Sequence, residues 1–188
     1  MRKYFLTLVF LSIIAFFATN NVFADDIGTV KIGLDMQGEH VVSIQGVSAT
    51  ENVDTGLSLT LEYGNQINEN MLIGCGITSQ LPRAQERFAG DFSFLPIYGL
   101  VKVGAGSSDI SPYFIGQLGY NFFMGDDLYK GTGVLEGGMY YGFGGGIIFQ
   151  KGPQVELLYS VNNGSVEWIG YEYDIEYSKV TLSFGYNF

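Results

Sequence analysis

The chain has 188 residues, a length typical of one compact domain, and its 19 acidic side chains outnumber 9 basic ones. The formal net charge of −10 argues against a nucleic-acid partner, because few cations are available to displace counterions from phosphates. Cys75 is the only cysteine, which excludes an internal disulfide and a cysteine-rich zinc site, and no pattern in the chain indicates another cofactor.

The first 24 residues have the features of a secretory signal peptide. Arg2 and Lys3 form a short basic region, an apolar stretch covers residues 4–17, and a small residue occupies position Ala24. This pattern predicts cleavage after Ala24, which would remove two cations and change the formal net charge from −10 to about −12. An uncleaved membrane anchor is the alternative. We expect residues 25–188 to form the mature domain.

The rest of the chain alternates apolar and polar residues at period two. In the stretch 57–64, for example, Leu57, Leu59 and Leu61 alternate with polar neighbours. Comparable alternation, less regular in places, marks eight stretches: residues 29–37, 57–64, 71–78, 92–103, 112–124, 138–149, 154–161 and 179–188. Such stretches predict half-buried β-strands, and tilted strands of this length can cross a bilayer. No apolar run long enough for a spanning helix occurs there, so any membrane crossing must use strands.

The connectors between these stretches alternate in length. Three are short, residues 65–70, 104–111 and 150–153, and four are longer, residues 39–54, 79–91, 125–137 and 162–176. Short turns on one side and long loops on the other are typical of outer-membrane barrels. We therefore predict an all-β fold, an eight-stranded antiparallel up-and-down transmembrane β-barrel with four extracellular loops. A soluble periplasmic barrel around an apolar ligand, with its faces reversed, is the alternative.

If the apolar side of each strand faces lipid, the opposite side faces the lumen. That side carries three cations and three anions: Lys31, Asp35, Glu62, Lys102, Glu156 and Lys179. Eight strands enclose a space that side chains fill, so charges within it must pair. The balance of signs predicts a polar interior that closes the pore and fixes strand register. A narrow pore for protons or small ions is the alternative.

Candidate catalytic residues are few. His40 is the only histidine, and it lies in the first long connector, three residues before Ser43. A lipid A-modifying outer-membrane enzyme would use a histidine with a serine, but we expect His40 to be a solvated loop residue and the protein not to be an enzyme. Cys75 lies on the lipid-facing side of its strand and is expected to act as a small hydrophobe.

The last long connector is rich in acidic and aromatic side chains. Its acidic residues are Glu167, Glu172, Asp174 and Glu176. Alternation across residues 171–177 predicts that the two flanking strands continue beyond the membrane as a hairpin. We expect a solvated acidic surface there, with a divalent-cation site as the alternative.

The last stretch ends the chain on an aromatic residue. Apolar side chains occupy every second position there, at Val180, Leu182, Phe184, Tyr186 and Phe188. This pattern resembles the C-terminal signal of bacterial outer-membrane barrels. The resemblance implies that the barrel-assembly machinery reads it as a strand added to an open edge, which is recognition by β-augmentation.

Residues 94–103 and 111–120 resemble the fourth and fifth strands of the OmpA/OmpX-like group of small outer-membrane β-barrel domains. The resemblance implies localisation in the bacterial outer membrane, contact with its lipid and a non-enzymatic envelope-structural or adhesin-like role. Host or surface molecules are then the expected partners of the loops, and a monomer is the expected state. Because nothing follows Phe188, we expect no peptidoglycan-binding domain such as OmpA carries.

Overall fold

The computed structural model describes residues 26–36, 38–84, 91–104, 109–125, 133–150, 152–168 and 171–188. The predicted signal peptide lies outside these ranges. The described residues form β1 (Asp26–Asp35), β2 (Gly38–Ile44), β3 (Val47–Val53), β4 (Gly56–Asn68), β5 (Met71–Gln80), β6 (Arg83–Ala84), β7 (Asp91–Val103), β8 (Ile110–Gly125), β9 (Val134–Phe149), β10 (Pro153–Trp168) and β11 (Tyr171–Asn187). They include no helix that is long and apolar enough to cross a membrane.

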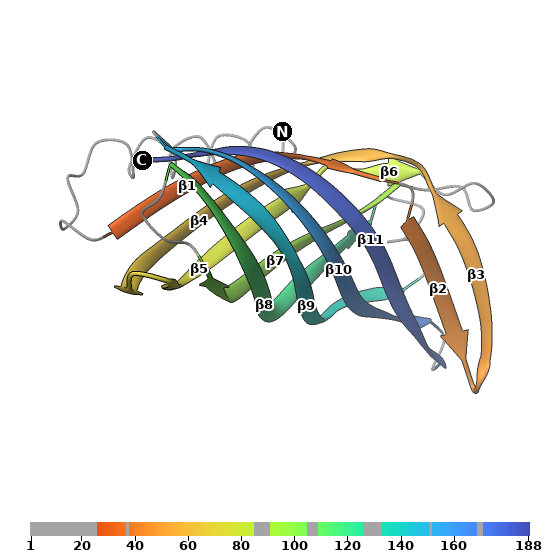
Figure 1. Ribbon diagram of the computed structural model, residues 1–188. Coiled ribbons are helices and arrows are strands. Elements are labelled where there is room, and N and C mark those ends of the chain that lie inside the picture. The colour runs from red at the N-terminus through yellow and green to blue at the C-terminus, as the bar shows by residue number, and fades with distance from the viewer. Residues whose placement is uncertain are drawn as a thin grey trace, which may run out of the picture.

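Eight of these strands close into an antiparallel barrel in the order β1-β4-β5-β7-β8-β9-β10-β11, and β11 pairs back to β1 (Figure 1). The closing pair joins Asp35 to Thr181 at one end and Thr29 to Asn187 at the other. Gly28 and Phe188 extend it through two backbone hydrogen bonds of 2.9 and 2.8 Å. The predicted eight-stranded up-and-down barrel is confirmed.

A sheet extends from the barrel on the side of the long connectors. β10 and β11 remain paired as far as Trp168 and Tyr171, which confirms the predicted hairpin. β2 and β3 form a second hairpin, and β2 pairs with residues 174–178 of β11 beyond the end of β1. Figure 1 shows these strands at the right, past the closed ring. On the predicted extracellular side, therefore, five strands lie in the order β9-β10-β11-β2-β3. The part of these strands beyond the barrel is called the extracellular sheet below.

The prediction that residues 39–54 form a loop is wrong, because most of them lie in β2 and β3. Gln45 and Gly46 connect these strands with φ angles of 48° and 85°. Two successive positive φ values are typical of the type I′ turn, whose twist matches that of paired strands. The outer part of β11 supplies the neighbour that orders β2.

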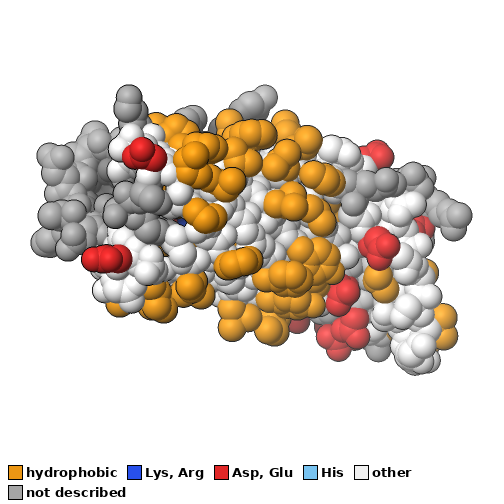
Figure 2. All heavy atoms as spheres, viewed as in Figure 1, with side chains coloured by type: hydrophobic (Ala, Val, Ile, Leu, Met, Phe, Trp, Pro, Cys, Tyr) orange, Lys and Arg blue, Asp and Glu red, His pale blue; other side chains and the backbone are white. Residues whose placement is uncertain are grey.

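The two faces of the barrel differ in chemistry as the alternation predicts. Large apolar side chains project outward and are exposed, among them Ile32, Phe114 and Leu118. Gln117, which precedes Leu118 in the same strand, is buried on the inner face. Figure 2 shows apolar side chains over the middle of the barrel surface and acidic side chains towards its two ends. This arrangement is the apolar band of a transmembrane barrel, with polar strand ends on both sides.

Glycines on the inner face leave room for two large lumen side chains. A Cβ atom added at Gly146 would lie 2.6 Å from the Tyr113 ring, and one at Gly76 would lie 2.7 Å from the Tyr98 ring. A side chain at either glycine would therefore collide with the neighbouring tyrosine ring. Gly146 belongs to the glycine-rich strand β9, and Gly76 belongs to β5.

Candidate functional site

Four of the six charged side chains predicted to face the lumen form one cluster there. Lys31 Nζ lies 2.6 Å from Glu62 Oε1 and 2.7 Å from Glu156 Oε1. Lys102 Nζ lies 2.9 Å from Glu62 Oε2. All four side chains are buried, and they come from β1, β4, β7 and β10. This central cluster, Lys31, Glu62, Lys102 and Glu156, thus ties strands on different sides of the barrel together and is electrically balanced.

Neutral side chains complete the hydrogen bonding of the two carboxylates. The Tyr98 hydroxyl and the Gln117 amide each donate to Glu62 Oε1 at 3.2 Å. The Tyr113 hydroxyl donates to Glu156 Oε2 at 2.7 Å. Buried ion pairs are stable only when such extra bonds satisfy the remaining lone pairs. The central cluster meets that condition.

A second cluster surrounds Asp35, closer to the extracellular end. Lys179 Nζ lies 2.6 Å from Asp35 Oδ1, and the Thr181 hydroxyl donates to the same oxygen at 2.6 Å. Arg83 donates to Asp35 Oδ2 through Nη2 and to the Tyr177 hydroxyl at 2.6 Å through Nη1. Arg83, Asp35 and Lys179, called the outer cluster below, therefore hold two cations against one anion, all of them buried.

Arg83 is a lumen residue that the sequence analysis missed. It lies in the connector 79–91, where the short strand β6 pairs with β7 and turns the guanidinium into the barrel mouth. Gly56 leaves space for it, since a Cβ there would lie 2.8 Å from Arg83 Cζ. A cation in an irregular connector has no strand parity, so only the fold could reveal its partner.

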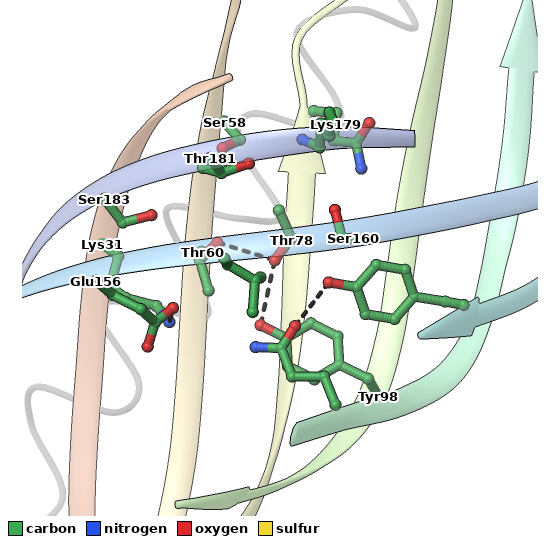
Figure 3. Close-up of a pocket in the computed structure, with 14 residues that line it drawn as sticks. Lys31, Ser58, Thr60, Thr78, Tyr98, Glu156, Ser160, Lys179, Thr181 and Ser183 are labelled. Carbon is green, nitrogen blue, oxygen red and sulfur yellow. Dashed lines mark hydrogen bonds and ion pairs between the residues drawn. The ribbon is translucent and has the colours of Figure 1, made fainter. Parts of the chain in front are cut away.

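The two clusters border one small cavity of about 20 Å³. Lys31 and Glu156 line it from the central cluster, and Lys179 lines it from the outer one. Figure 3 shows that hydroxyl side chains from several strands also line it: Ser58, Thr60, Thr78, Ser160, Thr181 and Ser183. This volume accommodates about one water-sized occupant.

An aromatic cluster fills the lumen at the predicted extracellular end. Phe92 contacts Phe94 and Tyr177 edge-on, with ring centroids 6.0 and 5.3 Å apart, and Phe94 stacks on Phe123 at 4.8 Å. Val53, Val166 and Ile175 complete this buried group. Apolar side chains thus occupy the inner face where the barrel meets the extracellular sheet. The strand predicted at 92–103 was irregular for this reason: its extracellular end is apolar on both faces.

His40 belongs to this aromatic cluster and is not a solvated residue, so that expectation is wrong. Its side chain is 1% exposed, and its ring lies 5.0 Å from that of Phe92. In the sheet it lies between Tyr177 on β11 and Glu51 on β3. Neither ring nitrogen has a hydrogen-bond partner in the described structure. Burial lowers the pKa of His40 from 6.5 to about 4, which favours the neutral ring.

The serine that could act with His40 is not beside it. Ser43 lies an odd number of residues away in the same strand, so its side chain faces the opposite side of the sheet. Its hydroxyl is 2.8 Å from that of Ser48 on β3. A serine–histidine pair at these positions is therefore excluded by the geometry.

The outer face of the extracellular sheet is acidic. The exposed carboxylates of Glu167 and Glu172 lie directly opposite each other on β10 and β11, and Asp174 and Glu176 follow on the same face of β11. All Lys and Arg residues in the described part of the chain are buried in the lumen. Within that part, no group of three or more potential ligands could hold a metal ion.

The C-terminal side chains project outward. Phe184, Tyr186 and Phe188 are exposed, and Val180 and Leu182 are partly buried on the same face. The Phe188 ring covers Gly28 on β1, where a Cβ atom would lie 2.6 Å from it. Cys75 is a free, exposed thiol on the outer face.

Comparisons with known proteins bear on the fold. No protein-family model matches the chain, and no curated protein matches it. Among solved structures it is similar to Ail, the attachment invasion locus protein of Yersinia pestis, with 14% identity and a TM-score of 0.50. That alignment covers 87% of this chain and 99% of Ail.

Two further structures are similar to the same degree. Neisserial surface protein A has 14% identity and a TM-score of 0.50, covering 87% of this chain and 97% of that one. The outer membrane protein OprG from Pseudomonas aeruginosa has 14% identity and a TM-score of 0.50, covering 88% and 96%. This chain therefore has the fold of the small outer-membrane β-barrels, as its resemblance to the OmpA/OmpX-like group implied.

Proposed function

We propose that this protein is a non-enzymatic component of the bacterial outer membrane, and that its closed barrel anchors an acidic binding sheet at the cell surface. The signal peptide is cleaved before Asp25 during export. One observation carries the proposal. The lumen is filled by ion pairs and covered by an aromatic cluster, while the sheet of β9, β10, β11, β2 and β3 continues beyond it with carboxylates on its outer face. The barrel then serves as the anchor and the sheet as the functional surface.

The apolar band supports placement in the outer membrane. Phe114 is 79% exposed and Phe143 is 61% exposed, and both belong to a surface covered with such side chains. A soluble protein rarely exposes a continuous apolar surface of this extent, whereas lipid stabilises it. We expect the outward side chains Val180 to Phe188 to be read by the barrel-assembly machinery before the strand pairs with β1.

The filled lumen argues against a pore. Ion flow would require the central cluster to separate and the aromatic cluster to move, and separating buried ion pairs is costly. We therefore expect no steady conductance in planar bilayers. His40, which has no hydrogen-bond partner among the described residues, and the Ser43 hydroxyl on the other face of the sheet likewise provide no activated nucleophile, so we expect unchanged lipid A in a deletion strain.

The acidic sheet supports a cationic binding partner. Ail has been crystallised with the heparin analogue sucrose octasulfate, a polyanion. Here Glu167, Glu172, Asp174 and Glu176 would repel such a ligand, and the described residues offer no outward cation to bind it. The outer edge of β3 is also unpaired among the described strands, which suits added strand pairing with a basic, extended segment of a surface protein.

The test combines location with binding. The protein should remain in the outer-membrane fraction after salt and osmotic shock, should require detergent for extraction, and should migrate faster on gels before heating than after. Immobilised protein should bind an oligolysine peptide and not sucrose octasulfate. Exchange of Glu172, Asp174 and Glu176 for Gln should abolish oligolysine binding, whereas the periplasmic-turn variant Glu69→Gln should retain it. Release by osmotic shock would contradict the anchor, and oligolysine binding unaffected by the triple exchange would contradict the binding sheet.

A further inference from the structure

The described charges inside the barrel do not cancel. Seven ionisable side chains are buried there, four basic and three acidic: Lys31, Arg83, Lys102, Lys179, Asp35, Glu62 and Glu156. The central cluster pairs two cations with two anions. The surplus positive charge therefore belongs to the outer cluster, where Asp35 alone faces Arg83 and Lys179. An uncompensated charge in such an environment is strongly unfavourable.

No described carboxylate compensates the surplus. The next acidic side chain on the inner face is Glu51 of β3, which forms no ion pair with a described cation and has a buried, unpartnered oxygen. Glu167, Glu172, Asp174 and Glu176 of the same sheet face the opposite, solvated surface. The described residues therefore leave a positive charge that a mobile anion, or loss of the Lys179 proton, would compensate.

The cavity beside Lys179 is suited to an anion. An ammonium group has three donors, and among the described residues Lys179 gives one to Asp35, while Lys31 gives two to Glu62 and Glu156. Both ammonium groups thus retain donors next to the cavity, which Ser160 and Ser183 also line. One carboxylate, Glu156, borders the same space, but Lys31 and Tyr113 already occupy its two oxygens.

We propose that this cavity is a binding site for a small monovalent anion, chloride in the natural environment, which neutralises the surplus charge of Arg83 and Lys179. A halide is only slightly larger than the water-sized occupant that about 20 Å³ admits, and it accepts several hydrogen bonds at once. The ion fills the gap between the two clusters and links them electrostatically, so the barrel is a chloride-stabilised structure.

The first test is direct. Crystals of the full mature protein grown in bromide should show an anomalous peak in the cavity, in contact with Lys179. A cavity that contains only water under these conditions would overturn the proposal. This result does not depend on any variant, and it leaves the proposed surface role unaffected.

The second test uses unfolding kinetics in vesicles at constant ionic strength. Replacing sodium gluconate, whose anion is too large for the cavity, by sodium chloride should slow wild-type unfolding in urea. At chloride about ten times above its dissociation constant the expected change is about tenfold. Lys179→Met should lose this response, and the control Glu69→Gln, an exchange in an exposed turn that leaves the cavity and the surplus charge in place, should retain it. Equal chloride responses of the wild type and Lys179→Met would overturn the proposal.

Discussion

Exchange of Glu62 for Gln should cost more stability than any change on the outer sheet. The Glu62 side chain is 3% exposed, and its carboxylate accepts hydrogen bonds from Lys31 at 2.6 Å, Lys102 at 2.9 Å, and Tyr98 and Gln117 at 3.2 Å. Glutamine preserves the shape but removes the charge, so Lys102 loses its described anionic partner. Breaking a buried pair in this way costs about 3–5 kcal/mol, which lowers the ratio of folded to unfolded protein by about 10² to 10⁴.

The assay is reversible urea unfolding of the mature chain in phospholipid vesicles, followed by circular dichroism and by heat-modifiable migration. Glu172→Gln is the matched control, because Glu172 is exposed and such exchanges change stability by about 0.5 kcal/mol or less. A second exchange, Lys102→Met, should restore part of the loss in Glu62→Gln, since it removes the cation left unpaired. A Glu62→Gln barrel as stable as Glu172→Gln would refute the reasoning that buried ion pairs hold the lumen closed.

Three further perturbations test other parts of the account. His40→Phe should remove a pH dependence of stability, because burial lowers the pKa of His40 from 6.5 to about 4. As the pH falls from 6.5 to 4, the wild type should lose up to about 3 kcal/mol of unfolding free energy relative to His40→Phe, and parallel plots of unfolding free energy against pH would contradict this. Gly146→Val should displace the Tyr113 ring and destabilise the barrel by about 1–3 kcal/mol in the same urea assay, whereas an unchanged midpoint would mean that the close approach is not required. Glu172→Lys should stabilise the hairpin of β10 and β11 by about 0.2–1 kcal/mol at low salt, because it replaces repulsion with Glu167 by attraction. Slower amide hydrogen exchange near the tip of this hairpin would show the effect, and unchanged exchange would contradict it.

The barrel ring was predictable from the sequence because its physical signal is local. Period-two alternation follows directly from strand geometry, and it separated outward Leu118 from inward Gln117 without knowledge of any neighbour. The same parity placed Lys31, Glu62 and Lys102 on the inner face, where the structure buries them. The alternation does not say which lysine meets which carboxylate, because partners come from strands far apart in the chain.

The features that the sequence analysis missed depend on long-range pairing. β2 is a strand because β11 continues past the end of β1 and offers it a free edge. His40 is buried for the same reason, since its inward side chain meets Phe92 only when that pairing forms. A local signal did exist in Gln45-Gly46, which suits a two-residue hairpin turn. Arg83 had no such signal, because its role depends on Asp35 across the barrel mouth.

Accessibility of spin labels along β8 tests the central claim most directly. Nitroxide labels are placed one at a time at the outward positions Phe114, Leu118 and Phe122 in a Cys75→Ser background, and the protein is folded into lipid vesicles. These labels should collide often with oxygen, which concentrates in lipid, and rarely with a water-soluble nickel complex. A label at Glu172 should show the reverse. Labels at Phe114, Leu118 and Phe122 that are shielded from oxygen or open to the nickel complex would contradict a lipid-facing apolar band around a closed, charged lumen.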